Sequence, residues 1–394
     1  MRAHSCKRRA LSAFIAAAVL FVLFPINAHA EASGSCVYEV GSERMLFGEN
    51  EDAKLPMAST TKIMTCLVAL ENSKLDEVVT VDAKAAGIEG SSMYLRAGET
   101  ITMQDLLLGL MLASGNDAAC AIAIHIAGSV EEFCKMMNEK ANEIGAVNTH
   151  FVTPNGLHDD EHYTTAKDLG LIACHAMKNE VFKSIVSTTN ADLKADEDSP
   201  ARYLRSKNKI LYQYEGGNGV KTGYTKAAGK CLVAGAERDG MQLVSVVLND
   251  YDMFKDSMAL LDKGFENYTL LTVLEKAEYM GQITVEGGLD KSVGLVADQE
   301  IRLPLAQNEF NMINRKVCVP DSIAAPVKKG QKIGSVEIYF QDELIASADL
   351  TADGDVFENS FLYHFGRVIK NWIHERGNIE NSEIFGVGRS SLET

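Results

Sequence analysis

The hydrophobic and polar positions divide the chain into regions of different periodicity. Between residues 31 and 272, segments with apolar residues three and four apart mix with alternating ones, which indicates helices and strands. Between residues 273 and 356, short alternating segments punctuated by Gly and Pro predict a small β-sandwich-like domain. A helical spacing of large apolar residues returns over 357–376. The expected fold class is α+β, followed by a separate all-β domain and a C-terminal amphipathic helix.

The helices of the first region carry recognisable start signals. Thr102 with Asp105 predicts a capped helix that ends near residue 112, and Thr165 with Asp168 predicts one that ends near residue 177. Further helices are expected over 117–127, 130–144 and 253–267. Strands are expected over 219–225, 231–237 and 243–249. The last two strands would form a hairpin, on which the helix at 253–267 would pack.

Another helix start is predicted just after Pro56, where a small polar run precedes an apolar series at helical spacing. Ser59 and Lys62 lie three positions apart and would share a face of this helix. A serine becomes a nucleophile beside a base, and a lysine acts as that base when burial or a neighbouring cation lowers its pKa. Because Ser-x-x-Lys is common by chance, the pair alone is more often an ordinary capped helix start with an exposed lysine.

The N-terminus carries a signal for export. Residues 1–30 begin with basic residues, continue with an apolar run and end in Ala28-His29-Ala30, which is typical of a cleaved secretory signal. An uncleaved anchor helix is the alternative, but the run is short for a membrane span.

The C-terminus predicts contact with a membrane surface. Large apolar residues, Trp372 among them, form one stripe of the helix over 357–376, which suits an interfacial helix. A helix docked on the β domain is the alternative. Residues 377–394 are expected to form a flexible polar tail.

Composition and charge exclude some classes of function. A net charge of −16 over 394 residues argues against a nucleic-acid partner. The seven cysteines after residue 30 are scattered and form no C-x-x-C pair, which argues against a zinc–cysteine site. Most of them lie in apolar segments as small core residues, and one disulfide that involves Cys36 stays open.

Two more short motifs lie downstream of the Ser59 segment. Ser114-Gly115-Asn116 falls in a predicted turn between helices, and Lys221-Thr222-Gly223 falls on a predicted strand that continues into Tyr224 and Thr225. Each motif is weak alone. All three in this order are much rarer by chance.

The motif set resembles the S-x-x-K, S-D-N and K-T-G signature of penicillin-binding proteins and class A β-lactamases. The Gly in the middle motif, the export signal, the β domain and the terminal helix are similar to the low-molecular-mass D-alanyl-D-alanine carboxypeptidases, over residues 31 to 375. The resemblance implies a β-lactamase/transpeptidase-like catalytic domain, with an antiparallel sheet and a helical subdomain. It implies an exported serine carboxypeptidase at the outer face of the cytoplasmic membrane or in the wall. This enzyme would need no cofactor, would trim peptidoglycan pentapeptide stems and would be acylated by β-lactams.

The resemblance also implies roles for individual residues. Ser59 would attack the scissile carbonyl, Lys62 would take its proton, and Ser114 would relay a proton to the leaving amine. The backbone N–H groups of Ser59 and Tyr224 would form the oxyanion hole. The remaining implied substrate-binding residues are Asn116, Lys221, Thr222, Gly223 and Thr225. In some relatives an arginine after the third motif helps to hold the carboxylate, whereas here residues 249–256 contain Lys255 and no arginine.

Three alternatives stay open at this point. A class A-like β-lactamase would need an E-x-x-L-N pattern, which residues 145–175 lack. The segment His158-Asp159-Asp160-Glu161-His162 matches the H-x-x-E-H pattern of zinc peptidases, although Pro154-Asn155-Gly156 just before it predicts a loop. A protein that only holds peptidoglycan is the third.

Overall fold

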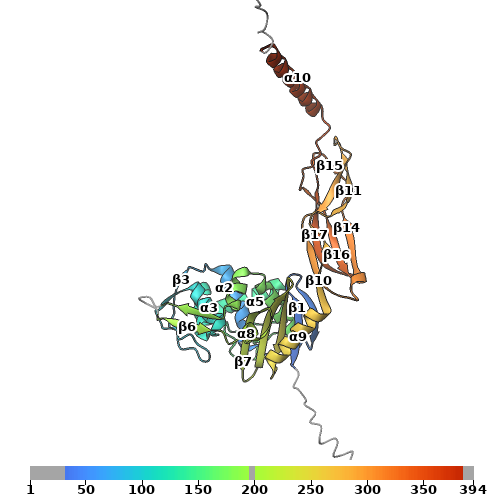
Figure 1. Ribbon diagram of the computed structural model, residues 1–394. Coiled ribbons are helices and arrows are strands. Elements are labelled where there is room, and N and C mark those ends of the chain that lie inside the picture. Colours follow the sequence, from blue (N-terminus) through green and yellow to red (C-terminus); the bar gives the residue numbers. More distant parts are fainter. Residues whose placement is uncertain (1–31, 195–199, 385–394) are drawn as a thin grey trace, which may run out of the picture. The chain divides into compact units, whose positions relative to one another are not determined.

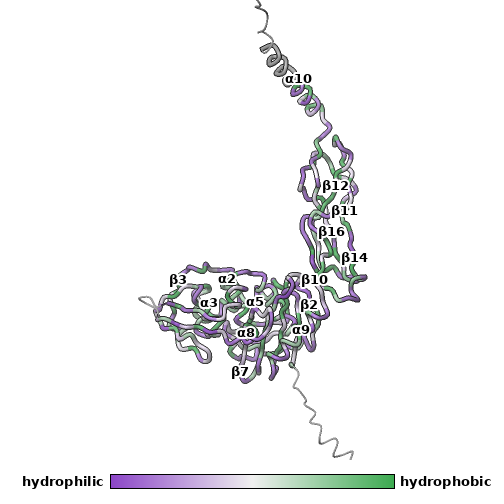
Figure 2. Tube along the Cα trace, viewed as in Figure 1, coloured by the Kyte–Doolittle hydropathy of each residue, from purple (hydrophilic) through white to green (hydrophobic). Residues whose placement is uncertain are grey.

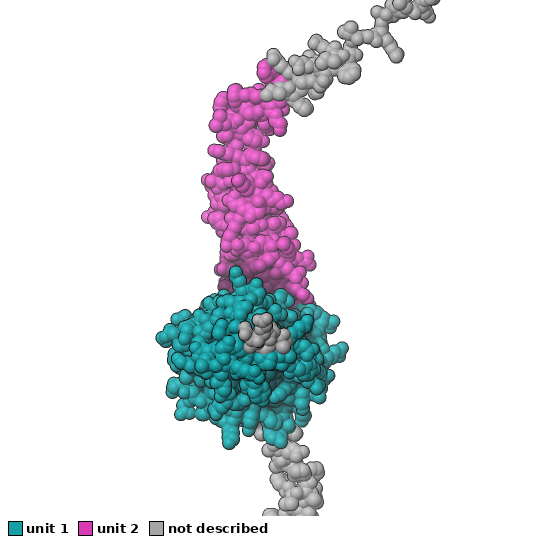
Figure 3. Space-filling view, turned by 90° about the vertical axis from the view of Figure 1, so that its left-hand side faces the viewer, with its two compact units in different colours: residues 1–264 teal, residues 265–394 magenta. Residues whose placement is uncertain are grey.

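The computed structural model describes residues 32–194 and 200–384, with side chains up to residue 372. The predicted export signal and the last ten residues lie outside the described residues. The chain divides into two compact units, up to Gly264 and from Phe265 onward (Figure 3). This boundary falls inside helix α9, Met253–Asn267, ahead of the boundary expected at residue 272.

The first unit contains a five-stranded antiparallel sheet in the order β2-β1-β9-β8-β7 (Figure 1). Its strands are β1 Gly34–Glu39, β2 Arg44–Glu49, β7 Gly217–Thr225, β8 Gly229–Arg238 and β9 Met241–Leu248. Successive residues of β1 face opposite sides, as a pleated strand requires. Tyr38 packs against Gly170 of helix α6, Ala166–Met177, whereas Val37 packs near Gly264 of α9. The sheet therefore lies between α6 and α9.

A helical subdomain adjoins this sheet. Its helices are α2 Lys62–Asn72, α3 Met103–Leu112, α4 Asn116–Ala127, α5 Val130–Ile144, α7 Glu180–Ser187 and the short α8 Ile210–Gln213. Two small two-stranded sheets complete it, β3 Val78–Thr80 with β4 Thr100–Thr102, and β5 Asn190–Leu193 with β6 Arg202–Arg205. The predicted caps are present, because the Thr102 and Thr165 hydroxyls accept hydrogen bonds from the backbone N–H groups of Asp105 and Asp168.

The prediction that Ser59 lies on the α-helix was wrong. Residues Ala58–Thr61 form a 3₁₀ turn, η1, and α2 begins at Lys62. The hydroxyls of Thr60 and Thr61 donate to the carbonyls of Met57 and Ala58, and these bonds compete with the regular helical pattern. Ser59 therefore lies on the tight turn just before α2.

The second unit is built from β-strands. A two-stranded sheet pairs β10 Tyr268–Leu274 with β13 Ile301–Ala306, and the six-stranded sheet has the order β14-β16-β17-β12-β11-β15. The six strands are β11 Tyr279–Glu286, β12 Ser292–Ala297, β14 Ile313–Cys318, β15 Ser322–Ala324, β16 Lys332–Phe340 and β17 Glu343–Ala352. A 3₁₀ turn, η2, spans Phe310–Met312. Two apolar clusters fill the unit, one around Ile338 and one around Val285, and the apolar positions are green in Figure 2.

Helix α10, Phe361–Ile384, follows the strands and continues past residue 376, where the sequence pattern ended it. In the described part of the chain, every helix is too short or too polar to span a bilayer. The cysteines after residue 30 are all free thiols, and all but Cys318 are buried.

Candidate active site

The structure brings Ser59 and Lys62 together at the N-terminal end of α2. The Lys62 Nζ atom lies 2.9 Å from Ser59 Oγ, 2.7 Å from Asn116 Oδ1 and 2.6 Å from the carbonyl oxygen of Asn155. The lysine is fully buried. Burial, and then the positive charge of Lys221, hold the pKa of Lys62 well below its usual range. Asp117 and the Cys120 thiol oppose this shift.

The acceptors around Lys62 set the direction of its hydrogen bonds. The Asn116 and Asn155 oxygens are carbonyl groups, which accept and cannot donate. A neutral amine has two N–H groups and one lone pair, so both N–H groups are used by these carbonyls. In this neutral state the lone pair is the group left to face Ser59 Oγ at 2.9 Å, where it can accept the hydroxyl proton. A neutral Lys62 is thus positioned to take the Ser59 proton.

Asn155 is a part of the site that the sequence did not reveal. It lies in the loop 151–164. At Gly156 (φ +82°) this loop packs against the 3₁₀ turn η1, which carries Ser59 and which we call the nucleophile turn. A Cβ atom on Gly156 would overlap the carbonyl group of Ala58, so only glycine allows this approach. The Asn155 carbonyl contact has no signature in the sequence, because every residue carries that group.

Lys221 of β7 and Ser114, in the turn between α3 and α4, form a second pair. The Lys221 Nζ atom donates to Ser114 Oγ at 3.0 Å and to the carbonyl oxygen of Thr222 at 2.8 Å. Burial, and then the nearby charge of Lys207, lower the pKa of Lys221 to about 7. Ser114 has a φ of +61°, the left-handed conformation that non-glycine residues adopt mainly where surrounding contacts hold them.

Strand β7 passes directly in front of the nucleophile turn. A Cβ atom on Gly223 would lie 3.0 Å from the backbone nitrogen of Ser59, so the two backbones are close. Tyr224 and Thr225, the next residues of β7, line the cleft together with Ser59. This arrangement puts the backbone beyond Gly223 near the N–H of Ser59, as a two-donor oxyanion hole requires.

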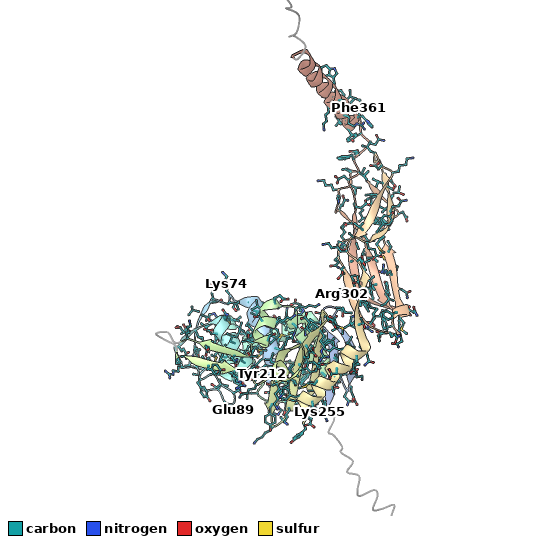
Figure 4. All side chains as sticks on the ribbon, in the orientation of Figure 1. Lys74, Glu89, Tyr212, Lys255, Arg302 and Phe361 are labelled. Atoms are coloured by element: carbon teal, nitrogen blue, oxygen red, sulfur yellow. The ribbon has the colours of Figure 1, made fainter. Side chains whose placement is uncertain are left out.

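A loop over residues 89–95 holds Asn116 in place. The Asn116 side-chain nitrogen donates to the carbonyl of Glu89 at 2.6 Å, and its backbone N–H donates to the carbonyl of Ser91 at 2.7 Å (Figure 4 labels Glu89). These bonds turn the amide oxygen toward Lys62. The second sequence motif includes Asn116 but not the loop that orients it.

Ser59, Asn116 and Asn155 line a cleft of about 860 Å³, and the two lysines lie buried behind this lining. Its outer wall includes Tyr94, Arg202, Tyr203, Arg205 and Lys207, none of which the sequence motifs indicated. Arg202 forms a buried ion pair with Glu99 at 2.6 Å and donates to the carbonyl of Met93. The β5–β6 hairpin is thus tied to the loop that holds Asn116.

The zinc alternative does not fit the geometry of residues 158–162. His162 is buried, and its Nδ1 atom accepts from the backbone N–H of Val152 at 3.0 Å, so its Nε2 atom donates to Thr61 at 2.8 Å. Both ring nitrogens are therefore occupied, and burial lowers the pKa of His162 to about 4. His158 is largely exposed and lies in the loop. His162 instead fastens this loop to the nucleophile turn.

Comparison with known proteins gives matches over both units. A family model described as D-alanyl-D-alanine carboxypeptidase matches residues 25–252, and one described as penicillin-binding protein 5, C-terminal domain, matches residues 268–358. The chain is 31% identical to D-alanyl-D-alanine carboxypeptidase DacF of Bacillus subtilis, over 87% of this chain and 90% of that protein. It is 32% identical to D-alanyl-D-alanine carboxypeptidase DacC of Escherichia coli, over 86% of each.

Solved structures agree with this result. The crystal structure of penicillin binding protein 5 from Haemophilus influenzae matches with a TM-score of 0.68 and 29% identity, over 85% of this chain and 100% of that one. The expected fold class, a transpeptidase-like domain followed by an all-β domain, is confirmed.

Proposed function

Because the chain belongs to the D-alanyl-D-alanine carboxypeptidase family, we propose that it removes the terminal D-alanine of peptidoglycan stem peptides through a Ser59 acyl-enzyme. The observation that carries the proposal is the buried Lys62 amine, 2.9 Å from Ser59 Oγ, with its two other neighbours able only to accept. A base of this kind makes an ordinary serine nucleophilic.

In the acylation step, Ser59 Oγ forms a bond to the carbonyl carbon between the two terminal D-alanines while Lys62 accepts the hydroxyl proton. The backbone N–H groups of Ser59 and Tyr224 hold the developing oxyanion. The C–N bond then breaks, and Ser114 passes a proton to the leaving amine. Lys221 donates to Ser114 at 3.0 Å, which supports the relay. Water later hydrolyses the ester and regenerates Ser59.

The substrate would lie between β7 and Asn116. The Asn116 amide would bind the substrate backbone. Thr222 and Thr225, with a protonated Lys221, would bind the terminal carboxylate. Because Lys62 must be neutral and Lys221 charged, we expect activity to rise with pH through the pKa of Lys62 and to fall above about 7, the pKa of Lys221.

Labelled penicillin tests the proposal. β-Lactams carry a reactive carbonyl in place of the scissile amide, so the native protein should form a stable covalent adduct. Ser59→Ala should form none while its thermal unfolding stays cooperative. Undiminished labelling of Ser59→Ala would exclude this nucleophile. The described residues that line the cleft include no Asp or Glu, which disfavours a β-lactamase that activates water with a glutamate.

We also propose that α10 rests on the surface of a membrane after export. Its large apolar side chains are exposed along one stripe, formed by Phe361, Leu362, Phe365, Val368, Ile369 and Trp372. Such a stripe on a helix that does not span the bilayer fits an interfacial position.

A further inference from the structure

One wall of the cleft carries a row of exposed side chains that the proposed chemistry leaves unused. Along β6 and the residues after it, Leu204, Ser206 and Asn208 are buried, and the residues before, between and after them in the alternation are exposed. We call these exposed residues the basic row; they are Tyr203, Arg205, Lys207 and Lys209. The alternating burial places the row on one side of this segment. Its first three members line the catalytic cleft.

The row continues beyond the cleft. Lys209 lines a neighbouring hollow of about 380 Å³, which Lys230 and Lys255 also line. The sequence as a whole has 54 acidic and 38 basic residues, so this run of cations opposes the charge of the chain. Of the residues that the structure describes, those lining the cleft include three cations and no carboxylate. The cleft therefore presents positive charge to its ligand.

The cations of the cleft differ in whether they are already neutralised. Arg202 is paired with Glu99 at 2.6 Å, whereas no ion pair forms to Arg205 or Lys207 within residues 32–194 and 200–384. Asp192 lies opposite Tyr203 in the β5–β6 pairing. It is within the described residues and forms no ion pair with the row. Arg205 and Lys207 are thus available to an anionic ligand.

Neighbouring side chains hold the row in position. The Tyr203 hydroxyl donates to Asn190 Oδ1 at 3.1 Å, and Asn190 lies opposite Arg205 in the strand pairing. The Arg205 guanidinium lies 5.9 Å from the centre of the Tyr212 ring, within reach of a cation–π contact. A guanidinium held in this way can bind a carboxylate through two parallel hydrogen bonds.

The position of Arg205 in the cleft indicates which part of a substrate it would contact. Lys207 lines the cleft together with Thr225, and its charge acts on Lys221, so Lys207 lies toward the pocket proposed for the terminal carboxylate. Arg205 is two residues further along, about 6.6 Å in an extended chain. A carboxypeptidase substrate ends at that terminal carboxylate. Only the peptide on the N-terminal side of the scissile bond can therefore extend along the wall.

We propose that Arg205, supported by Tyr203, binds a side-chain carboxylate of the donor peptide, upstream of the D-Ala-D-Ala bond, and so selects acidic stem peptides. This inference rests on the proposed carboxypeptidase function and adds a specificity residue to it. Lys207 is excluded from the test because its charge also acts on Lys221.

Two matched substrates test the subsite. Acetyl-lysyl-D-Ala-D-Ala is capped on the lysine side chain with succinyl, which ends in a carboxylate, or with its carboxamide analogue of nearly equal size. D-Alanine release gives kcat/KM for each peptide with the native protein, Arg205→Gln and Arg96→Gln. Arg96 is exposed in the loop over 87–98 and does not line the cleft, so its replacement removes the same charge nearby.

We expect the native protein to favour the carboxylate peptide about threefold to fivefold at low ionic strength, as an exposed ion pair would. The ratio should approach one at high salt. Arg205→Gln should lose the preference, keep its activity on the carboxamide peptide and keep its penicillin acylation rate, whereas Arg96→Gln should retain the preference.

Three results would overturn the subsite. They are a native ratio near one at low salt, a preference that survives in Arg205→Gln, and an equal loss in Arg96→Gln. Each leaves penicillin acylation and D-alanine release intact, so the proposed function would stand. Absence of acylation and of release from both peptides would instead overturn the proposed function, and this inference with it.

Discussion

Asp117 offers the sharpest test of how the site is held together, because it is a fully buried carboxylate directly behind Asn116. Its two oxygens accept four hydrogen bonds, from Ser92 Oγ at 2.6 Å and from the backbone N–H groups of Met93, Leu95 and Ala118 at 3.1, 3.0 and 2.9 Å. Three of the four donors belong to the loop that orients Asn116. Asp117→Asn keeps the shape and replaces one acceptor oxygen with a donor.

The cost follows from the donors that face the new amide. The remaining amide oxygen can serve the N–H groups of Met93 and Ala118, and the Ser92 hydroxyl can rotate to accept. The Leu95 N–H cannot, and it would be left buried beside an NH₂ group. An orphaned buried donor and the lost charge together cost about 2–3 kcal/mol. For a unit of this size, that lowers the melting temperature by roughly 5–10 °C.

The substitution also changes the charge near Lys62. Asp117 raises the pKa of Lys62, against the larger effects of burial and Lys221. His162 also lies near Lys62, and because burial lowers its pKa to about 4, it carries little charge above that pH. Removing the carboxylate charge should therefore lower the pKa of Lys62. Because the neutral amine is the active form, the acidic midpoint of penicillin acylation should move to lower pH.

Thermal unfolding and the pH profile of acylation measure both effects. Asp168→Asn is the matched control, since Asp168 is also buried and accepts from Asn148 N at 2.6 Å and Thr149 Oγ1 at 2.9 Å. Asp168→Asn should lower the melting temperature without moving the acidic midpoint of penicillin acylation. An unchanged melting temperature in Asp117→Asn would contradict this account of the loop. A shift of its acidic midpoint of acylation to higher pH would contradict it as well.

Four other perturbations have defined outcomes. Gly156→Ala should cost about 2 kcal/mol or more in unfolding free energy, measured by urea denaturation, because its φ of +82° is strained for alanine and the new Cβ meets Ala58; an unchanged midpoint would contradict the close approach. Lys221→Gln should move the acidic midpoint of penicillin acylation to higher pH, since a like charge that lowers the pKa of Lys62 is lost; a shift to lower pH would contradict this. EDTA should leave D-alanine release unchanged; a loss of release that added zinc restores would instead support a zinc site. Phe365→Asp should weaken sedimentation with anionic lipid vesicles without changing penicillin acylation; equal sedimentation would argue against the interfacial helix.

The sequence predicted those parts of the molecule that depend on side-chain type. The hydroxyl caps at Thr102 and Thr165 follow local rules, and strands β7–β9 lie within two residues of their predicted ranges. The nucleophile and its base were indicated because the chemistry needs particular functional groups at fixed positions.

Other parts depend on backbone groups and on contacts between distant segments. The carbonyl of Asn155 has no residue signature, and its approach to Lys62 depends on the loop path at Gly156. No sequence motif marked β5 or β6, whereas β6 pairs with β5 and lines the cleft through Arg202–Arg205. His158 and His162 match the H-x-x-E-H sequence pattern of zinc peptidases. In the structure, however, both ring nitrogens of His162 form hydrogen bonds, to Thr61 and to the backbone of Val152.

The central claim is that Lys62 is a neutral base facing Ser59, and its titration tests this directly. Protein labelled with ¹³C at the lysine Cε position can be titrated by NMR, with Lys62→Arg used to assign the signal. We predict that this signal titrates well below the ordinary lysine pKa of about 10.4, and that penicillin acylation rises over the same pH interval. A Lys62 signal that titrates near the ordinary value, with acylation complete at lower pH, would contradict the account.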